Sequence, residues 1–276
     1  MKKLTIIMYH YVRELPFTRY PKIKGLLESQ FREQLNYIEK YYQFVTVDDC
    51  INALNSDANF PTNAILLTFD DGYIDQYTTV FPTLQDRGIQ GCFFPPAKAI
   101  LENKVLDVNK IHFILASVSN IDDLIQDIYF YLDKYRAEYS LESNEYYFRG
   151  LARDYRFDPK EVIFIKRLLQ RELIEELRNL IVDELFCKYV TEDEGMFSRE
   201  LYMSIDQLKC MVKNGMYIGS HGFDHYWLDK LSPKKQEIEI ELSIEFLKKL
   251  GAPTDNWIMC YPYGSYNESL IKILKK

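Results

Sequence analysis

The chain has 276 residues, of which 47% are hydrophobic and 27% charged, a composition typical of a folded globular protein rather than a disordered one. Its formal net charge of -7 provides no basic surface for a phosphate backbone, so nucleic acid is not expected as a partner. No stretch approaches the roughly 20 apolar residues that cross a bilayer, so no membrane span is expected.

The N-terminus begins Met-Lys-Lys, but the apolar run from Leu4 ends at Met8 and is too short for the hydrophobic region of a secretory signal peptide. The five cysteines are an odd number, and none of them stands in a CxxC pair, a pattern typical of reduced thiols. We therefore expect a cytoplasmic protein whose cysteines are free.

Short apolar runs alternate with helical patterns in the first hundred residues and again near the end of the chain. The predicted strands are Leu4–Met8, Ala64–Phe69, Gln90–Phe94, Tyr217–Ser220 and Trp257–Tyr261. Helices are predicted after three serines that can cap them, over the segments Ser29–Tyr41, Ser204–Gly215 and Ser232–Gly251. This alternation indicates an α/β fold with a parallel sheet or barrel.

From about Leu101 to Arg199 the strand pattern disappears, and apolar residues recur at helical spacing, as in Ile121–Tyr139 and Glu161–Tyr189. The charges in this segment are mixed in sign, which is typical of helix faces in contact with solvent. We interpret it as a helical insertion, at about 101–199, in one catalytic domain that spans residues 1–276. The pattern leaves open whether the insertion also covers a substrate.

The strand from Ala64 leads into Thr68-Phe69-Asp70-Asp71-Gly72-Tyr73, which places two adjacent carboxylates at the C-terminal end of a buried strand. α/β folds keep their active sites at this end. Because adjacent side chains point in different directions, one carboxylate can bind a cation while the other handles a proton. The alternative is a structural Asp-Asp-Gly turn in which Asp71 caps the next helix.

A second polar segment, Ser220-His221-Gly222-Phe223-Asp224-His225, also follows a predicted strand. Two imidazoles four positions apart on a helical turn lie roughly 5–6 Å from each other, close enough to share an ion. Two His and one carboxylate suit zinc and similar metals and leave coordination positions for water and substrate. Surface histidines without a shared role are the alternative, although two of the four histidines in the chain fall here.

A third segment, Tyr261-Pro262-Tyr263-Gly264, closes the last predicted strand. Pro262 cannot donate to a strand ladder and Gly264 permits an unusual backbone turn, so the chain should bend sharply here. Such a bend can direct a backbone N–H into a pocket. The alternative is a turn with a structural role alone.

Together these segments resemble the NodB-homology polysaccharide deacetylases, also called carbohydrate esterase family four. TFDDGY resembles the first motif of that family, SHGFDH the second, and YPYG the core of the third. Met8-Tyr9-His10 and the helical stretch from Glu239 to Ser243 add to the similarity, which covers about 1–94 and 203–276. The resemblance implies a distorted (β/α) barrel of about seven strands, or fewer if the barrel is incomplete at the C-terminus.

The resemblance also implies a role for each motif residue. Asp70 would be the general base, and Tyr263 would offer its backbone N–H to the oxyanion. One divalent metal, zinc in the first place with cobalt, nickel or iron as alternatives, would be bound by Asp71, His221 and His225. The implied reaction is removal of an N-acetyl group, with O-acetyl and formyl groups as second choices, from a sugar by metal-activated water. With export not expected, an acetylated amino sugar or glycan precursor in the cytoplasm is the expected substrate.

Two features depart from the family pattern. Cys260 stands where members often carry an Arg that pairs with the base. A related subgroup also lacks this Arg and has a Tyr-His pair near its start, so we expect His10 to occupy part of that polar site. The alternative is that His10 is an ordinary histidine at a strand end.

The family also has a late His that protonates the leaving amine, and no His follows His225 here. A shortened chain, return of the proton by Asp70, and a weak or inactive glycan-binding relative are the explanations left open. A further alternative is hydrolysis of a cyclic ureide or imide on the same fold.

Overall fold

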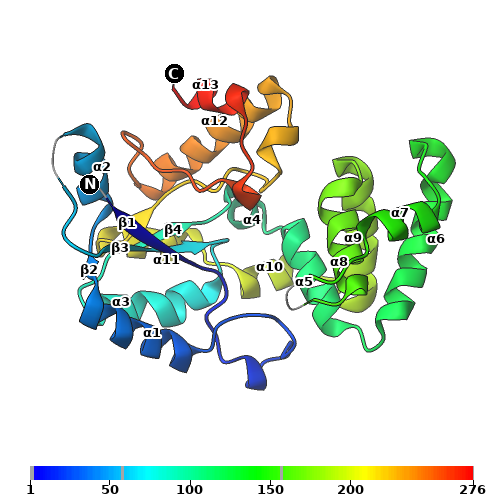
Figure 1. Cartoon of the computed structure of the whole chain (residues 1–276), viewed down its shortest axis with the longest axis horizontal. Helices are drawn as coiled ribbons and strands as arrows, with labels where there is room; N and C mark the ends of the chain where they lie inside the picture. The colour runs from blue at the N-terminus through cyan, green and yellow to red at the C-terminus, as the bar shows by residue number, and fades with distance from the viewer. Residues whose placement is uncertain (1–2, 57–58, 156–157, 276) are drawn as a thin grey trace. The chain divides into compact units, whose positions relative to one another are not determined.

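The structure is a computed structural model that describes residues 3–56, 59–155 and 158–275. The chain divides into two compact units. Unit 1 comprises Met1–Leu15, Lys24–Lys104 and Ser198–Lys276, and unit 2 comprises Pro16–Ile23 and Val105–Phe197. Figure 1 shows the elements of both units.

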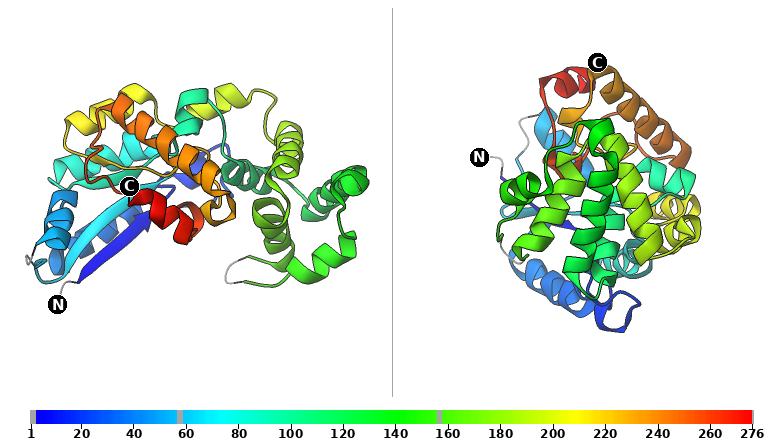
Figure 2. Two further views of the ribbon diagram at one scale, coloured as in Figure 1. Left: turned by 90° about the horizontal axis from the view of Figure 1, so that it is seen from above. Right: turned by 90° about the vertical axis from the view of Figure 1, so that its right-hand side faces the viewer.

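Unit 1 is built on one parallel sheet. Its strands are β1 (Leu4–Tyr9), β2 (Gln43–Phe44), β3 (Ala64–Asp70), β4 (Gly91–Phe94) and β5 (Tyr217–Ile218). β3 is central, since it pairs with β1, β2 and β4, and β4 in turn pairs with β5. Figure 2 shows β1 and β3 side by side. All residues of β3 are buried, which explains its unbroken apolar run before the polar end.

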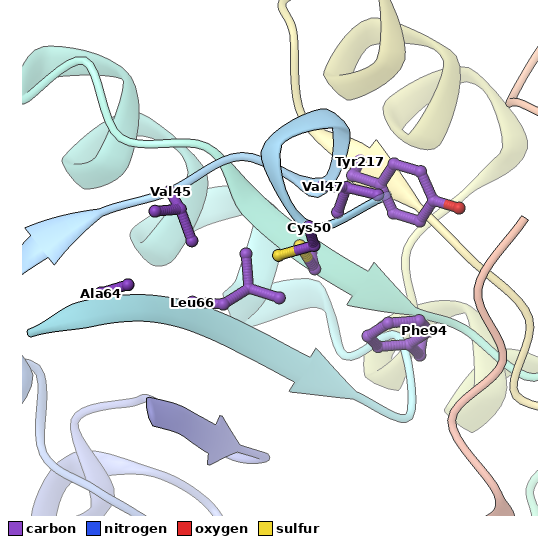
Figure 3. Close-up of a cluster of buried hydrophobic side chains, with 8 residues drawn as sticks. Val45, Val47, Cys50, Ala64, Leu66, Phe94 and Tyr217 are labelled. Carbon is purple, nitrogen blue, oxygen red and sulfur yellow. The ribbon is translucent and has the colours of Figure 1, made fainter. Parts of the chain in front are cut away.

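Helices cover the sheet and carry its hydrophobic core. The helical elements of unit 1 are α1 (Glu28–Tyr41), α2 (Val47–Asn55), the π-helix η2 (Gln76–Val80), α3 (Phe81–Asp86), α4 (Ala97–Glu102), α11 (Ile205–Lys213), η4 (Leu228–Lys230), α12 (Pro233–Leu250), η5 (Pro262–Gly264) and α13 (Glu268–Leu274). In Figure 1, α1 and α3 lie on one side of the sheet and α12 on the other. One core cluster brings Cys50 of α2 against Leu66 and Phe94 of the sheet (Figure 3).

The predicted α/β class with a parallel sheet is confirmed, and four predicted strands correspond to β1, β3, β4 and β5. The described residues hold five strands, which agrees with the expectation of about seven strands or fewer. The segment Trp257–Tyr261 is not a strand: it forms a single parallel bridge, between Ser220 and Met259. Its pairing ends there because the chain leaves the sheet on both sides, at His221 and at Pro262.

Two of the three predicted helix caps are confirmed. The side chain of Ser204 accepts a hydrogen bond from the backbone of Gln207 at the start of α11, and Ser232 caps α12. Ser29 does not cap α1, since it lies within the first turn, and the Gln30 side chain instead accepts the N–H of Leu27 (3.2 Å). A Gln at N3 satisfies the N–H of the N-cap residue, which is the second bond of a capping box.

The described residues of unit 2 form helices without a regular strand. The elements are α5 (Asp107–Ser117), α6 (Ile121–Tyr139), α7 (Asn144–Leu151), α8 (Lys160–Arg167), the π-helix η3 (Leu168–Glu172) and α9 (Glu175–Tyr189), while η1 (Leu15–Phe17) and α10 (Glu194–Leu201) cross the boundaries between the units. The pattern over Ile121–Tyr139 predicts α6, but Glu161–Tyr189 is divided near Leu173, where the backbone becomes extended. That this segment is an insertion in one catalytic domain stays a prediction. Among the described helices, none combines the length and apolar character needed to cross a membrane.

Candidate metal centre and active site

The two aspartates lie where β3 ends and the backbone turns. Asp71 (φ 69°) and Gly72 (φ 70°) both adopt the left-handed conformation, and the Asp71 N–H donates to the carbonyl of Phe94 at the end of β4 (3.1 Å). A Cβ at Gly72 would lie 2.8 Å from that of Pro95, so only Gly fits this position. The turn therefore directs the carboxylates of Asp70 and Asp71, both buried, to different neighbours.

Three predicted ligands converge on one point. The Nε2 atoms of His221 and His225 lie 3.1 Å apart, and Asp71 Oδ1 lies 3.5 Å from the first and 3.3 Å from the second. All three side chains are buried. Unlike ligands on a regular helix, the two His lie on an irregular loop in which Gly222 (φ 76°) and His225 (φ 60°) are left-handed.

The geometry and the donor set fit a metal ion. In a tetrahedral zinc site with bonds of roughly 2.0–2.1 Å, the ligand atoms are about 3.3 Å apart, the spacing found among these three atoms. Asp71 Oδ1 has no hydrogen-bond partner among the described residues, an arrangement that is costly for a buried carboxylate without a cation. His221 Nδ1 lies 2.7 Å from the carbonyl oxygen of Cys260, which can only accept, so Nδ1 carries the proton and Nε2 is left to bind the ion.

The charges of the three groups support the same interpretation. Burial raises the pKa of Asp71, but its contacts with His221 and His225 outweigh burial and hold that pKa well below its usual range. Burial lowers the pKa of His225, so this imidazole is neutral, the form that binds metal. Burial also opposes protonation of His221, but Asp71 raises its pKa well above the usual value. A divalent cation would take the place of that proton.

Tyr73 orients the Asp71 carboxylate. Its hydroxyl, fully buried, donates to Asp71 Oδ2 at 2.5 Å and so leaves Oδ1 to face the two histidines. The ring of Tyr73 stacks on that of Tyr11, with centroids 3.9 Å apart. Tyr73 belongs to the TFDDGY segment, but its type alone did not predict this contact.

Asp70 has different surroundings from Asp71. Its Oδ2 lies 3.3 Å from the Cys260 thiol, and its Oδ1 has no hydrogen-bond partner among the described residues. Its backbone carbonyl accepts a hydrogen bond from the side-chain amide of Gln76 in η2. Burial raises the pKa of Asp70, and His221 and His10 oppose that shift through their charge. A buried carboxylate with a raised pKa and one free oxygen is suited to accept a proton.

Cys260, rather than His10, makes the side-chain contact to Asp70. The Cys260 thiol donates to Oδ2, and together with His221 the two residues form a second compact group of ligand-type atoms. His10 follows β1, its side chain is exposed, and its backbone carbonyl accepts a long hydrogen bond from Gln76 (3.4 Å). The expected role of His10 in the polar site stays a prediction.

Tyr263 lies in a tight turn beside the histidines. Its φ of 57° is left-handed, and the turn is closed by a hydrogen bond from the Gly264 N–H to the Tyr261 carbonyl (2.9 Å). The ring of Tyr263 meets that of His225 edge-on at 4.8 Å and stacks flat on Trp227 at 4.4 Å. The sequence predicted a bend here but not this aromatic pair. The role of the Tyr263 N–H stays a prediction.

The sequence matches a family model described as Polysaccharide deacetylase over residues 57–129 and 189–276, more than half of the chain. YxkH of Bacillus subtilis (strain 168), whose name assigns it to the polysaccharide deacetylases, is 30% identical over 99 residues, which cover 36% of this chain and 33% of that protein. The poly-beta-1,6-N-acetyl-D-glucosamine N-deacetylase of Escherichia coli (strain K12) is 43% identical over 58 residues, or 21% of this chain and 9% of that enzyme. The matches thus span about a third or less of these relatives.

Solved structures share the fold over nearly the whole chain. The Streptococcus pyogenes deacetylase PplD in complex with acetate has a TM-score of 0.56 at 16% identity, with 99% of this chain and 79% of that chain covered. IcaB from Ammonifex degensii has a TM-score of 0.55 at 20% identity, with 100% and 80% covered. At these identities the likeness establishes the fold alone.

Proposed function

Because this chain belongs to the polysaccharide deacetylase family, we propose that it is a metal-dependent hydrolase that removes the N-acetyl group from an amino sugar or glycan. The observation that carries the proposal is the convergence of Asp71, His221 and His225 beside a separate buried carboxylate, Asp70. Two His and one carboxylate leave room for water and substrate, while a nearby acid can accept a proton.

Asp71, His221 and His225 would hold one divalent ion, with zinc as first choice and cobalt, nickel or iron as alternatives. Such an ion, when bound, polarises an amide carbonyl and lowers the pKa of water. The His221 Nδ1–H bond to the Cys260 carbonyl fixes the ring so that Nε2 faces the site. The Tyr73 hydroxyl similarly fixes which oxygen of Asp71 faces it.

Asp70 accepts the proton of the attacking water on Oδ1, the oxygen that has no other partner among the described residues. The water oxygen bonds to the acetyl carbon, and the carbonyl electrons move onto oxygen, where the Tyr263 backbone N–H stabilises the charge. When the C–N bond breaks, Asp70 returns the proton to the leaving nitrogen. The acetic acid that forms passes its own proton to the amine, so the products are acetate and a protonated amine, and Asp70 ends in its initial carboxylate form.

The family and one relative support this substrate class. The Escherichia coli relative is named for N-deacetylation of poly-beta-1,6-N-acetyl-D-glucosamine, which favours an N-acetylglucosamine unit for this chain over an O-acetyl or formyl group. The flat pair of Trp227 and Tyr263 beside His225 offers an apolar surface for a sugar ring. A glycan precursor in the cytoplasm remains the proposed natural form of the substrate.

The test is acetate release from N-acetylglucosamine oligomers, with O-acetylated sugars, formylated sugars and a cyclic imide as comparison substrates. The protein should be assayed after zinc loading and after dialysis against a chelator. Acetate release from the N-acetyl substrates that disappears with the chelator and returns with zinc is the expected result. Turnover of the imide alone would contradict the proposal, and zinc binding without turnover of any substrate would favour an inactive glycan-binding protein.

A further inference from the structure

The loop between the two metal-site histidines has an unusual backbone that needs external support. Gly222 and His225 both have left-handed φ values, and this conformation at a non-glycine residue costs roughly 1–2 kcal/mol. The loop carries both imidazoles, so any relaxation of its backbone would move their Nε2 atoms apart. The groups that hold the loop therefore bear directly on the metal centre.

Glu239 on α12 binds the middle of this loop. Its side chain is 5% exposed, and its Oε2 accepts the consecutive backbone N–H groups of Phe223 (2.9 Å) and Asp224 (3.0 Å). One acceptor oxygen on α12 thus satisfies two consecutive donors of the loop. A Cβ at Gly222 would lie 3.3 Å from the same oxygen, so the glycine allows the acid to approach this closely.

The other contacts of the loop involve its carbonyls and side chains rather than the N–H groups of Phe223 and Asp224. Backbone N–H groups at the start of α4 bind the loop carbonyls, from Ala97 to Gly222 (3.3 Å) and from Lys98 to Phe223 (3.0 Å). Lys98 also forms an ion pair with the Asp224 side chain. One turn further along α12, the Ser243 hydroxyl contacts that of Ser220 at 2.9 Å. The carbonyls are thus held from α4, whereas the N–H groups of Phe223 and Asp224 are held by Glu239.

We propose that Glu239 is a positioning residue of the metal centre: by accepting the Phe223 and Asp224 N–H groups, it holds the loop in the conformation that brings the Nε2 atoms of His221 and His225 together. This inference rests on the proposed metal site. Glu239 acts through the loop backbone and does not touch the ion. Groups that orient metal ligands typically change metal affinity by about 10–100-fold when they are removed.

The test compares Glu239→Ala, Glu239→Asp and Glu239→Gln in the full chain, with Glu241→Ala, an exposed acid on the same helix, as the matched control. Zinc affinity is measured by competition with a chromogenic chelator, and the visible spectrum of the cobalt-substituted protein reports the ligand geometry. Removing or shortening the acceptor should weaken zinc about 10–100-fold and alter the cobalt spectrum. Gln keeps an oxygen acceptor and should restore affinity to within about 3-fold of the unmodified chain, as should the control.

The outcomes separate this inference from the proposed function. Folded Glu239→Ala with unchanged zinc affinity and cobalt spectrum would overturn the positioning role, and the same result for Glu239→Asp decides the matter if the Ala variant does not fold. If the unmodified chain binds zinc but releases no acetate, the proposed reaction fails while the affinities still decide the role of Glu239. If the unmodified chain binds no metal, both proposals fail.

Discussion

The two carboxylate oxygens of Asp71 have different partners, since Oδ2 accepts the Tyr73 hydroxyl and Oδ1 faces the two histidines. Asp71→Ala should therefore lower zinc occupancy, because the ion loses charge and a ligand. Asp70→Asn should leave zinc bound but reduce acetate release about 10²-fold or more, the usual loss for a positioned base. Calorimetric zinc binding and acetate release on both variants measure these two effects.

The comparison requires equal folded fractions, which circular dichroism can establish. Loss of zinc from both variants would make Asp70 a ligand as well. Undiminished turnover in Asp70→Asn would remove Asp70 as the base. Because Asp70 and Asp71 are neighbours in the chain, different effects of the two substitutions on zinc binding would show that the two carboxylates have separate roles.

The Tyr73 hydroxyl gives a more conservative test of the site. Tyr73→Phe removes the hydroxyl that donates to Asp71 Oδ2, so the carboxylate should rotate more freely and zinc affinity should fall about 10-fold. Competition with a chelator measures the change. Tyr9→Phe is the control, because it also removes a hydroxyl from a buried tyrosine, one bound to Gln34 instead (2.9 Å). Equal affinities for both variants would contradict the orienting role of Tyr73.

Sequence motifs predicted which residues would meet at the site, but not how each is held. Asp71, His221 and His225 follow strand ends, so their convergence could be expected from a parallel sheet alone. The Cys260 thiol bond to Asp70 joins positions far apart in the chain and depends on the path of the last segment. Such contacts between distant residues have no local pattern, which is why the sequence identified Cys260 only as a departure from the family.

Among the elements, the turn after β3 combines a left-handed glycine with a close neighbour. Gly72→Ala should destabilise unit 1 by about 3 kcal/mol or more, because a Cβ would combine a left-handed φ with a 2.8 Å approach to Pro95. Gly88 has a similar φ of 65° but no atom within 4 Å of an added Cβ, so Gly88→Ala should cost only about 1 kcal/mol. Urea unfolding of both variants gives the difference, and equal losses would show that the overlap at Pro95 is relieved.

Elements were predictable where their own residues determine them. β3 begins with an apolar run because its residues are buried on both faces of the sheet, and this pattern identified it. The segment Trp257–Tyr261 has a similar composition but makes only one bridge, since a strand also requires a partner with the right path. The aromatic pair of Trp227 and Tyr263 likewise arises from two separate turns.

For the molecule as a whole, Glu239 should make stability depend on pH. Burial raises the pKa of Glu239 from 4.5 to about 7. The hydrogen bonds from the Asp224 and Phe223 N–H groups and the charge of Lys98 lower this pKa, whereas the charge of Asp224 adds to the rise. The folded state therefore holds a proton that the unfolded state releases, so the free energy of unfolding falls as the pH rises from 4.5 to about 7. The contribution is up to about 3 kcal/mol.

Urea unfolding of the metal-free protein across this pH range measures the effect, with Glu239→Gln as the comparison. The variant cannot ionise at this position, so its free energy of unfolding should decline less steeply with pH. Parallel curves for the two proteins would show that Glu239 titrates normally.

For the chain as a whole, the sequence predicted the fold class and a separate helical segment at about 101–199, but not that Pro16–Ile23 belongs to unit 2. Pro16–Ile23 belongs to unit 2 because it packs on helices far along the sequence: the Tyr20 ring meets that of Phe113 at 4.9 Å, and Lys22 donates to the Val118 carbonyl at 3.0 Å. Nothing in the local pattern of these eight residues indicates such distant contacts.

The π-helix η2 has a consequence for how this sequence can change in length. A π turn holds about one residue more than an α turn and is frequent at functional sites. Deleting one residue within Gln76–Val80 would give a regular helix, which we expect the scaffold to accept. If the deleted residue is Gln76, the side-chain amide that donates to the Asp70 carbonyl is lost as well. Homologues without this extra residue should therefore keep the fold while supporting the base in another way.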